Sequence, residues 1–320
     1  MIKVGITGAE KPIAGELVRI LINHPEVEIR ALYSPEYSGR SMQSIHHGMI
    51  GEKIIKISDK LDFDNLDIIF IVENYPEIAS IPQLLEKYPE MRIVDLTGSH
   101  LGGEEIENIE YGLSEINRKA LVRGARAAVI PSATASLILM GLYPLAFSQL
   151  IDGKIEVEVA APRDIVQNFD SLKTSEELNK QIRKIDNSFS GDFNIKISPN
   201  KSERVIRVKL TLSSPLSLDE IEKLFKELYD DHNFVFTSMS EIEGREVEGT
   251  QKSVITIDKP DNDTLVLDIV GDCRLRGGAG DAIHVMNLFF ALYEKIGLTL
   301  KPSRYGLDME STSRASTWVG

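Results

Sequence analysis

The sequence predicts an α/β domain with a parallel sheet, followed by an α+β domain with a mixed or antiparallel sheet. In the first part of the chain, short apolar runs alternate with segments of helical spacing, which is typical of a parallel sheet. From Lys154 the pattern changes, because KIEVEVAA alternates apolar and polar residues as a half-exposed strand does. Strands and helices are then segregated, which favours an α+β arrangement.

The first domain begins with a buried strand at residues 2–7 and a helix at residues 12–22. Leu17, Ile20 and Leu21 share one face of that helix, and Pro12 suits its first turn. The remaining elements are predicted as strands at 27–32, 67–72 and 92–96 and a helix at 77–88.

The second domain is expected to hold an amphipathic helix at 174–185 and a helix at 216–229. Asp219 and Glu220 in the first turn of the latter favour a helix start. Strands are predicted at 154–161, 193–197 and 205–212, and at the runs VITID and TLVLDIV.

Composition excludes several classes of function. The chain has 320 residues, of which 42% are hydrophobic, and a net charge of −13, which argues against nucleic acid as the main partner. No apolar run approaches the roughly 18 residues of a membrane helix, and the first residues lack the layout of a signal peptide. A single cysteine excludes an internal disulfide and a cysteine-cluster metal site. We therefore expect a cytoplasmic protein with no membrane partner.

Glycines gather at the first strand–turn–helix corner. Gly5, Gly8 and Gly15 lie where the phosphate-binding turn of a Rossmann domain would be, but Lys11 holds the place of the usual third glycine. Lys11 could contact phosphate as a point charge, or it could block a pyrophosphate. The second strand that follows strengthens the prediction of a nucleotide-binding corner.

The loop after the second strand has no acid of the kind that binds the ribose hydroxyls of NAD. Ser34, Ser38 and Arg40 are instead the residue types of a 2′-phosphate pocket, although SPEYSGRS also fits a solvated loop. His46 and His47 follow, and we interpret them as structural because no carboxylate or cysteine partner has metal-ligand spacing. We expect no metal site.

The central stretch, residues 124–146, places a short apolar strand before Pro131 and a buried helix after it. Ser132, Thr134 or Ser136 could cap that helix. A strand that feeds a helix N-terminus suits a nucleophile, because the free amides and the helix dipole stabilise an anion. The residue at this corner is Ala133, whose methyl group offers no chemistry.

Three segments carry a family resemblance. IPSATAS with GLYPLA, YGLSEINR (111–118) and GGAGDAIHVMNL (277–288) resemble motifs of the N-acyl-γ-glutamyl-phosphate reductases of arginine biosynthesis, in the aspartate-semialdehyde dehydrogenase superfamily. The resemblance covers about residues 1–306. It implies a Rossmann domain, NADP as cofactor, and a semialdehyde dehydrogenase-like second domain.

The same resemblance indicates a degenerate member. The family's catalytic cysteine falls on Ala133, and the two histidines that supply its general base fall on Leu172 and Thr174, while Glu177 keeps that motif's acid. Gly278 and Gly280 are kept at the cofactor-facing helix, but two polar residues have become Asp281 and Val285. The anion-binding loop after residue 161 is shortened. NADP binding is therefore implied but could be lost.

The resemblance also implies the domain limits. We expect a Rossmann-like domain at 1–132, completed by a C-terminal helix at about 278–306, and an α+β domain at 133–277 of the oligomerisation and substrate type. We expect residues 307–320 to form a flexible tail. A homo-oligomer, dimer or tetramer, is implied, and the shared sheet interface could also bind a protein partner such as an active paralogue.

Two residues could replace the missing nucleophile. Cys273 lies beside Arg274 and Arg276, which could lower its pKa. Ser132 adjoins the corner but has no visible base. Arg163 and Asp164 could line a remodelled pocket, or form an ordinary surface pair.

We therefore predict an inactive or impaired homologue that retains nucleotide, ligand or partner binding. The alternative is an active NADP-dependent reductase with a shifted nucleophile, and a third reading is a nucleotide sensor.

Overall fold

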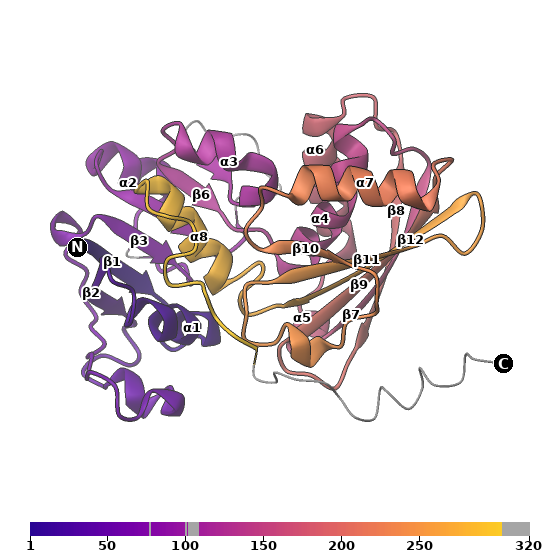
Figure 1. Ribbon diagram of the computed structural model, residues 1–320. Helices are drawn as coiled ribbons and strands as arrows, with labels where there is room; N and C mark the ends of the chain where they lie inside the picture. Colours follow the sequence, from indigo (N-terminus) through magenta and orange to yellow (C-terminus); the bar gives the residue numbers. More distant parts are fainter. Residues whose placement is uncertain (77, 100, 102–108, 303–320) are drawn as a thin grey trace.

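The computed structural model describes residues 1–76, 78–99, 101 and 109–302, and these form two domains that each contain a six-stranded sheet (Figure 1). The fold class predicted from the sequence is confirmed: the first sheet is wholly parallel and the second is mixed. The expected tail at 307–320 lies outside the described residues.

The first sheet has the strand order β2-β1-β3-β4-β6-β5. Its central strands are buried on both faces, which explains their continuous apolar runs. Helices α1, α3 and α8 pack on one face and α2 packs on the other. The elements are β1 (Ile2–Thr7), α1 (Pro12–Leu21), β2 (Val27–Tyr33), β3 (Ile68–Ile71), α2 (Ile81–Lys87), β4 (Arg92–Asp95), β5 (Ile109–Tyr111), α3 (Ser114–Val122), β6 (Ala127–Val129) and α8 (Ala279–Phe289).

The second sheet has the order β10-β11-β12-β9-β7-β8, with parallel pairs at both edges and antiparallel pairs between them. Alternate side chains of its strands pack against helices α4, α6 and α7 on one face. The elements are α4 (Ala133–Phe147), β7 (Lys154–Ala161), α5 (Arg163–Gln167), α6 (Ser171–Ile185), β8 (Asp192–Pro199), β9 (Val205–Ser213), α7 (Leu218–Tyr229), β10 (Val235–Ser238), β11 (Ser253–Asp258) and β12 (Thr264–Asp272).

The chain crosses between the domains twice. It leaves the first sheet at β6 and enters α4, which is buried along almost its whole length in the core of the second domain. It returns after β12 through a glycine-rich turn into α8, which packs beside α1 and α3 in the first domain (Figure 1). The turn approaches α4 closely, because a Cβ atom on Gly277 would lie 2.1 Å from the backbone nitrogen of Ala133.

Two predicted helices are shorter than expected. The helix expected at 278–306 ends at Phe289, because Ala291 adopts a left-handed φ of +52° and the amide of Leu292 bonds back to the carbonyl of Asn287. The helix expected at 77–88 begins at Ile81, where Ser80 and Gln83 form a capping box. The extent of the C-terminal helix that the resemblance implied was therefore wrong between residues 290 and 302, the last residue that the structure describes here.

Candidate functional site

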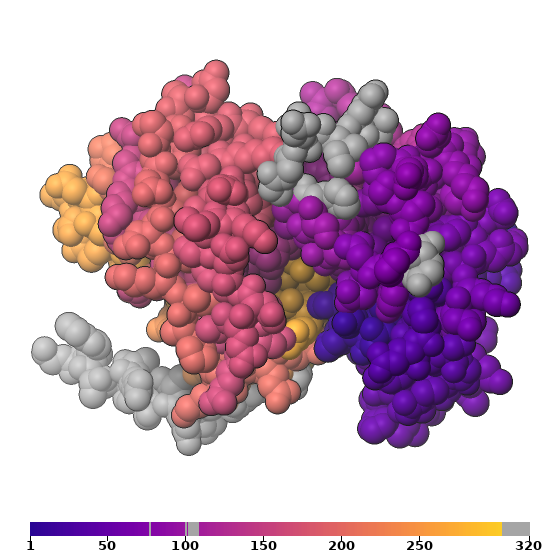
Figure 2. Space-filling model, turned by 180° about the vertical axis from the view of Figure 1, so that it is seen from behind, coloured from indigo at the N-terminus to yellow at the C-terminus, as the bar shows by residue number. Residues whose placement is uncertain are grey.

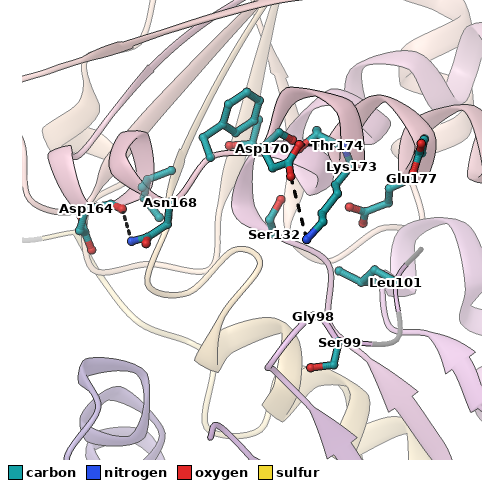
Figure 3. A pocket seen from close by; sticks show the side chains of 14 residues that line it. Gly98, Ser99, Leu101, Ser132, Asp164, Asn168, Asp170, Lys173, Thr174 and Glu177 are labelled. Atoms are coloured by element: carbon teal, nitrogen blue, oxygen red, sulfur yellow. Dashed lines mark hydrogen bonds and ion pairs between the residues drawn. The ribbon is translucent and has the colours of Figure 1, made fainter. Parts of the chain in front are cut away.

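A pocket of about 620 Å³ lies between the two domains. In Figure 2 the indigo-to-purple first domain and the pink-to-orange second domain meet along a groove, and the pocket is lined from both sides of it. The first domain contributes the loop after β4, and the second contributes the start of α4 and the segment from α5 into α6 (Figure 3). The lining residues that matter below are Ser99, Ser132, Asp164, Asp170, Lys173, Thr174, Glu176 and Glu177.

The N-terminus of α4 faces this pocket. Pro131 ends the extended segment, and the side chain of Ser132 caps the helix by accepting a hydrogen bond from the amide of Ala135 at 3.2 Å. Ser132 and Thr134 line the pocket on either side of Ala133, the first helical residue. The structure thus places Ala133 at a helix N-terminus suited to an anion, with a methyl group as its only side chain.

Glu177 and Tyr111 form a pair at one end of the pocket. The phenol of Tyr111 donates a 2.7 Å hydrogen bond to Oε1 of Glu177, which joins β5 to α6. Glu177 is only 6% exposed, and burial raises its pKa to about 7 although the Tyr111 hydrogen bond acts in the opposite direction. Burial and the neighbouring Glu177 also hold the pKa of Tyr111 well above its usual value. Figure 3 shows Glu177 and Lys173 directed toward the same space.

The remaining charges of the pocket are mostly acidic. Asp164 pairs with Arg274 at 2.7 Å, so that arginine is already neutralised. Asp170 caps α6 by accepting from the amides of Leu172 and Lys173, and its other oxygen lies 4.0 Å from the ammonium of Lys173. With Glu176 and Glu177 also lining the cavity, its carboxyl groups outnumber its amines.

The two positions that the resemblance assigns to a general base hold no base. Leu172 is 79% exposed and is absent from the pocket lining. Thr174 does line the pocket, but its hydroxyl donates to the carbonyl of Asp170 at 2.8 Å within the first turn of α6. Glu177, one turn later on the same helix, is a buried titratable group that lines the pocket.

Cys273 lies apart from the pocket lining. It is 3% exposed in the core of the second domain, and burial raises its pKa to about 12. The neighbouring guanidinium groups do not offset this burial, because Arg274 pairs with Asp164 and Arg276 pairs with Glu115 and Asp281. A thiol in this environment is almost entirely protonated near neutral pH.

The structure places Gly8 and Lys11 in the turn after β1, whereas Gly5 lies within β1 and Gly15 lies within α1. Gly8 has a φ of +66° in the turn, and Lys11 precedes α1. Gly5 packs against Leu66, and Gly15 packs against His46, whose Nε2 lies 2.8 Å from the carbonyl of Ala9. His46 therefore packs against α1 at this corner, and its ring leaves no room for a side chain at Gly15.

The other predicted nucleotide contacts are dispersed. Ser34 is buried at the end of β2, whereas Ser38 and Arg40 are exposed on the following loop, where Arg40 stacks on Tyr37 at 5.5 Å. Gly278 caps α8 beside Ile13 of α1, and Gly280 packs against the amide group of Gln251. Asp281, at the start of α8, is buried against Arg276 rather than directed to a ligand.

The described residues also bear on metal binding and on the membrane. Within them, no group of three or more His, Cys, Asp or Glu side chains could hold a metal ion. The helices of the same residues include none that is long and apolar enough to cross a membrane.

Comparison with known proteins identifies relatives over most of the chain. Residues 3–123 match the family described as semialdehyde dehydrogenase, NAD binding domain. N-acetyl-gamma-glutamyl-phosphate reductases of Bacteroides thetaiotaomicron and Bacteroides fragilis are each 28% identical to this chain, over 95% of it and 100% of their own lengths.

Solved structures show the same fold at lower identity. Aspartate semialdehyde dehydrogenase II of Vibrio cholerae, complexed with ASA, aligns with a TM-score of 0.67 at 14% identity, covering 92% of this chain and 99% of that one. Aspartate semialdehyde dehydrogenase with NADP from Candida albicans aligns with a TM-score of 0.65 at 13% identity and the same coverage.

Proposed function

We propose that this chain does not reduce an acyl phosphate through a thioester. We propose instead that it binds a small polar ligand in the pocket between its domains. The chain is a homologue of the N-acetyl-gamma-glutamyl-phosphate reductases and has the semialdehyde dehydrogenase fold. The relatives confirm the family resemblance and the fold that the motifs predicted. Two parts are our own proposal: that catalysis is lost, and that a small polar ligand binds in the pocket. The residues of the site support both parts.

Ala133 is the observation that carries the proposal. A thioester route needs a thiolate at the helix N-terminus, where free amides stabilise it and the developing oxyanion. Ala133 holds that position, and the chain has only one cysteine in its whole sequence. That cysteine, Cys273, is buried with a raised pKa and lies outside the pocket lining.

The charges of the pocket oppose an acyl phosphate as ligand. Such a molecule carries two or more negative charges and needs an excess of Lys and Arg. This cavity offers Lys173, while Asp164 and Asp170 hold Arg274 and Lys173 respectively in ion pairs. Glu177 is buried without a cationic partner among the described residues. The complementary ligand is therefore neutral or cationic and donates a hydrogen bond to Glu177.

A reductase assay tests the first half of the proposal. The protein is incubated with N-acetyl-glutamyl phosphate and NADPH, with the Bacteroides thetaiotaomicron relative as the positive control. We expect no turnover above the background without protein. Turnover would refute the proposal, and its loss in Cys273→Ser would assign the chemistry to that thiol.

Thermal unfolding tests the second half. Ornithine and arginine serve as cationic probes and N-acetylglutamate as an anionic one. We expect the cations to raise the midpoint temperature of unfolding, because a ligand that binds only the folded state stabilises that state. The anion should leave the midpoint temperature unchanged. Glu177→Gln should abolish the shift while Glu176→Gln keeps most of it. A larger shift with the anion would contradict the charge argument.

We also propose that two copies associate through the outer face of the second sheet. Helices α4, α6 and α7 cover the opposite face, while the outer face presents Glu158, Lys209, Thr211 and Val266. The mixture of both charge signs suits a self-complementary contact. Light scattering after size-exclusion chromatography should give twice the chain mass for the wild-type protein. Val266→Asp should give the mass of a single chain, whereas Leu172→Asp on α6 should still give twice the chain mass.

A further inference from the structure

The loops after β1 and β3 flank the crevice of the first domain. The strand order reverses there, since β2 lies on one side of β1 and β3 lies on the other. Open α/β sheets bind ligands at this point, and a dinucleotide places its pyrophosphate over the glycine turn at the N-terminus of the first helix. In this chain the turn is Gly8 to Lys11 and the helix is α1.

We infer that this crevice does not accept a dinucleotide, because four side chains of the protein itself occupy the place of the pyrophosphate and make it acidic. Glu10, Lys11, Glu73 and Tyr75 form this set, which we call the crevice cluster. The inference is independent of the proposed loss of catalysis, since it concerns binding alone.

Glu73 removes the space above the glycine turn. A Cβ atom on Gly8 would lie 2.8 Å from the Cβ of Glu73 and 3.2 Å from its backbone nitrogen, so the chain already fills the approach that a glycine leaves open for a phosphate. Buried Thr7 holds Glu73 there: its hydroxyl donates to the carbonyl of Glu73 at 2.9 Å and accepts from the amide of Val72 at 3.1 Å.

The charge of the crevice cluster also opposes a phosphate. The ammonium of Lys11 lies 2.7 Å from Oε2 of Glu73 and 3.8 Å from Oε1 of Glu10, and the hydrogen bond with Glu73 is the main reason that the pKa of Lys11 is raised. Two carboxylates therefore face one cation. Oε2 of Glu10 is buried without a hydrogen-bond partner among the described residues, so it would repel an incoming pyrophosphate.

Tyr75 closes the side of the crevice next to β2. Its hydroxyl donates to Oε1 of Glu10 at 3.4 Å, and its ring meets that of Tyr33 edge-on with the centroids 5.0 Å apart. Ser34, which follows Tyr33, is buried, and Arg40 is exposed and stacked on Tyr37. The residues expected to hold a 2′-phosphate are therefore not assembled around a common point.

Calorimetry with NADPH and NADH tests the inference on the full chain. We expect the wild-type protein to bind both with a Kd weaker than about 1 mM. The double variant Glu10→Gln with Glu73→Gly removes both carboxylates, frees Lys11 and removes the Cβ atom of residue 73 above Gly8. It should tighten binding of NADPH at least about tenfold. Glu86→Ala, an exposed carboxylate on α2, is the matched control and should not change binding.

Each outcome is decisive. Micromolar binding by the wild-type protein would overturn the inference without any variant. A double variant that unfolds at the wild-type temperature and still fails to bind would show that the crevice cluster is not what excludes the dinucleotide. Binding of NADPH by the double variant, without acyl-phosphate turnover, would support both this inference and the proposed function. A failure of the proposed function would appear only in the reductase assay.

Discussion

The hydroxyl of Tyr111 and the carboxyl group of Glu177 meet across the two domains at 2.7 Å. Tyr111 ends the edge strand β5 of the first sheet, and Glu177 projects from α6 of the second domain. Because burial raises the pKa of Glu177 to about 7, the carboxyl group of this pair titrates near neutral pH inside the pocket. Protonation of Glu177 therefore competes with a hydrogen bond from a ligand, because both use the same carboxyl oxygen atoms.

Glu177 should make the protein less stable as the pH rises. The folded state holds its proton up to about pH 7, while an unfolded glutamate releases it near the ordinary value of 4.5. The folded state thus binds more protons between these values, and stability falls by up to about 3 kcal/mol across them. Urea unfolding at pH 5 and pH 8 should show a smaller fall in Glu177→Gln than in the wild type.

Glu176→Gln is the matched control for this titration, because Glu176 is the exposed neighbour on the same helix. Its difference in unfolding free energy between pH 5 and pH 8 should equal that of the wild type. An unchanged pH dependence in Glu177→Gln would contradict the raised pKa of Glu177.

Thiol labelling should distinguish the two positions discussed as nucleophiles. Cys273 is buried, so the wild-type thiol should react with a disulfide reagent only when the protein unfolds. Ala133→Cys should add one thiol that reacts in the folded state, with a pKa lowered by the start of α4. In the double variant Ala133→Cys with Cys273→Ser, the thiol at position 133 is the only one, so any labelling of the folded protein comes from that thiol. Equal protection of both thiols would mean that the corner is closed to the pocket.

Arg276 should be the most costly charged residue to remove. It is completely buried and lies 2.7 Å from Glu115 and 2.8 Å from Asp281. Arg276→Met would leave two buried carboxylates without a cation and should cost about 3–5 kcal/mol in urea unfolding. Arg274→Met removes a more accessible pair with Asp164 and should cost less than about 1 kcal/mol. Equal costs would contradict this account.

Glu294 should contribute to stability in acid. A hydrogen bond with His284 and the nearby Arg118 lower its pKa to about 2 in the folded state. Its contribution is therefore present above about pH 4.5 and is lost as the pH falls toward 2. Acid unfolding of Glu294→Gln should begin at higher pH than in the wild type, and Glu52→Gln, an exposed glutamate, should leave the midpoint in place.

Local patterns predicted most elements of the fold. The apolar runs of β1 and β3, the alternation in β7 and the acidic first turn of α7 all lie where the sequence indicated, because each depends on neighbouring residues along the chain. The expected end of α8, which came from the family resemblance, was wrong, because a left-handed Ala291 and a loop held by Asn287 stop the helix.

The site was less accessible to such reasoning. Glu177 was noticed as a retained acid, but its raised pKa depends on Tyr111, which is 66 positions away in the sequence, and on burial between the domains. The local pattern around Glu73 and Tyr75 predicted no role for either side chain. That they occupy the crevice beside Lys11 follows from the adjacency of β1 and β3.

The sequence by itself determined the two-domain fold class, the resemblance to the reductase family, the alanine at the start of α4 and the presence of a single thiol. These are properties of residue identity and of short-range periodicity, which a chain carries before it folds. The tertiary structure alone decided that Cys273 is buried, that Glu177 titrates near neutrality and that the members of the crevice cluster meet beside the glycine turn. Burial, ion pairing and desolvation depend on residues distant in sequence, and they are defined only after the sheets and helices have packed.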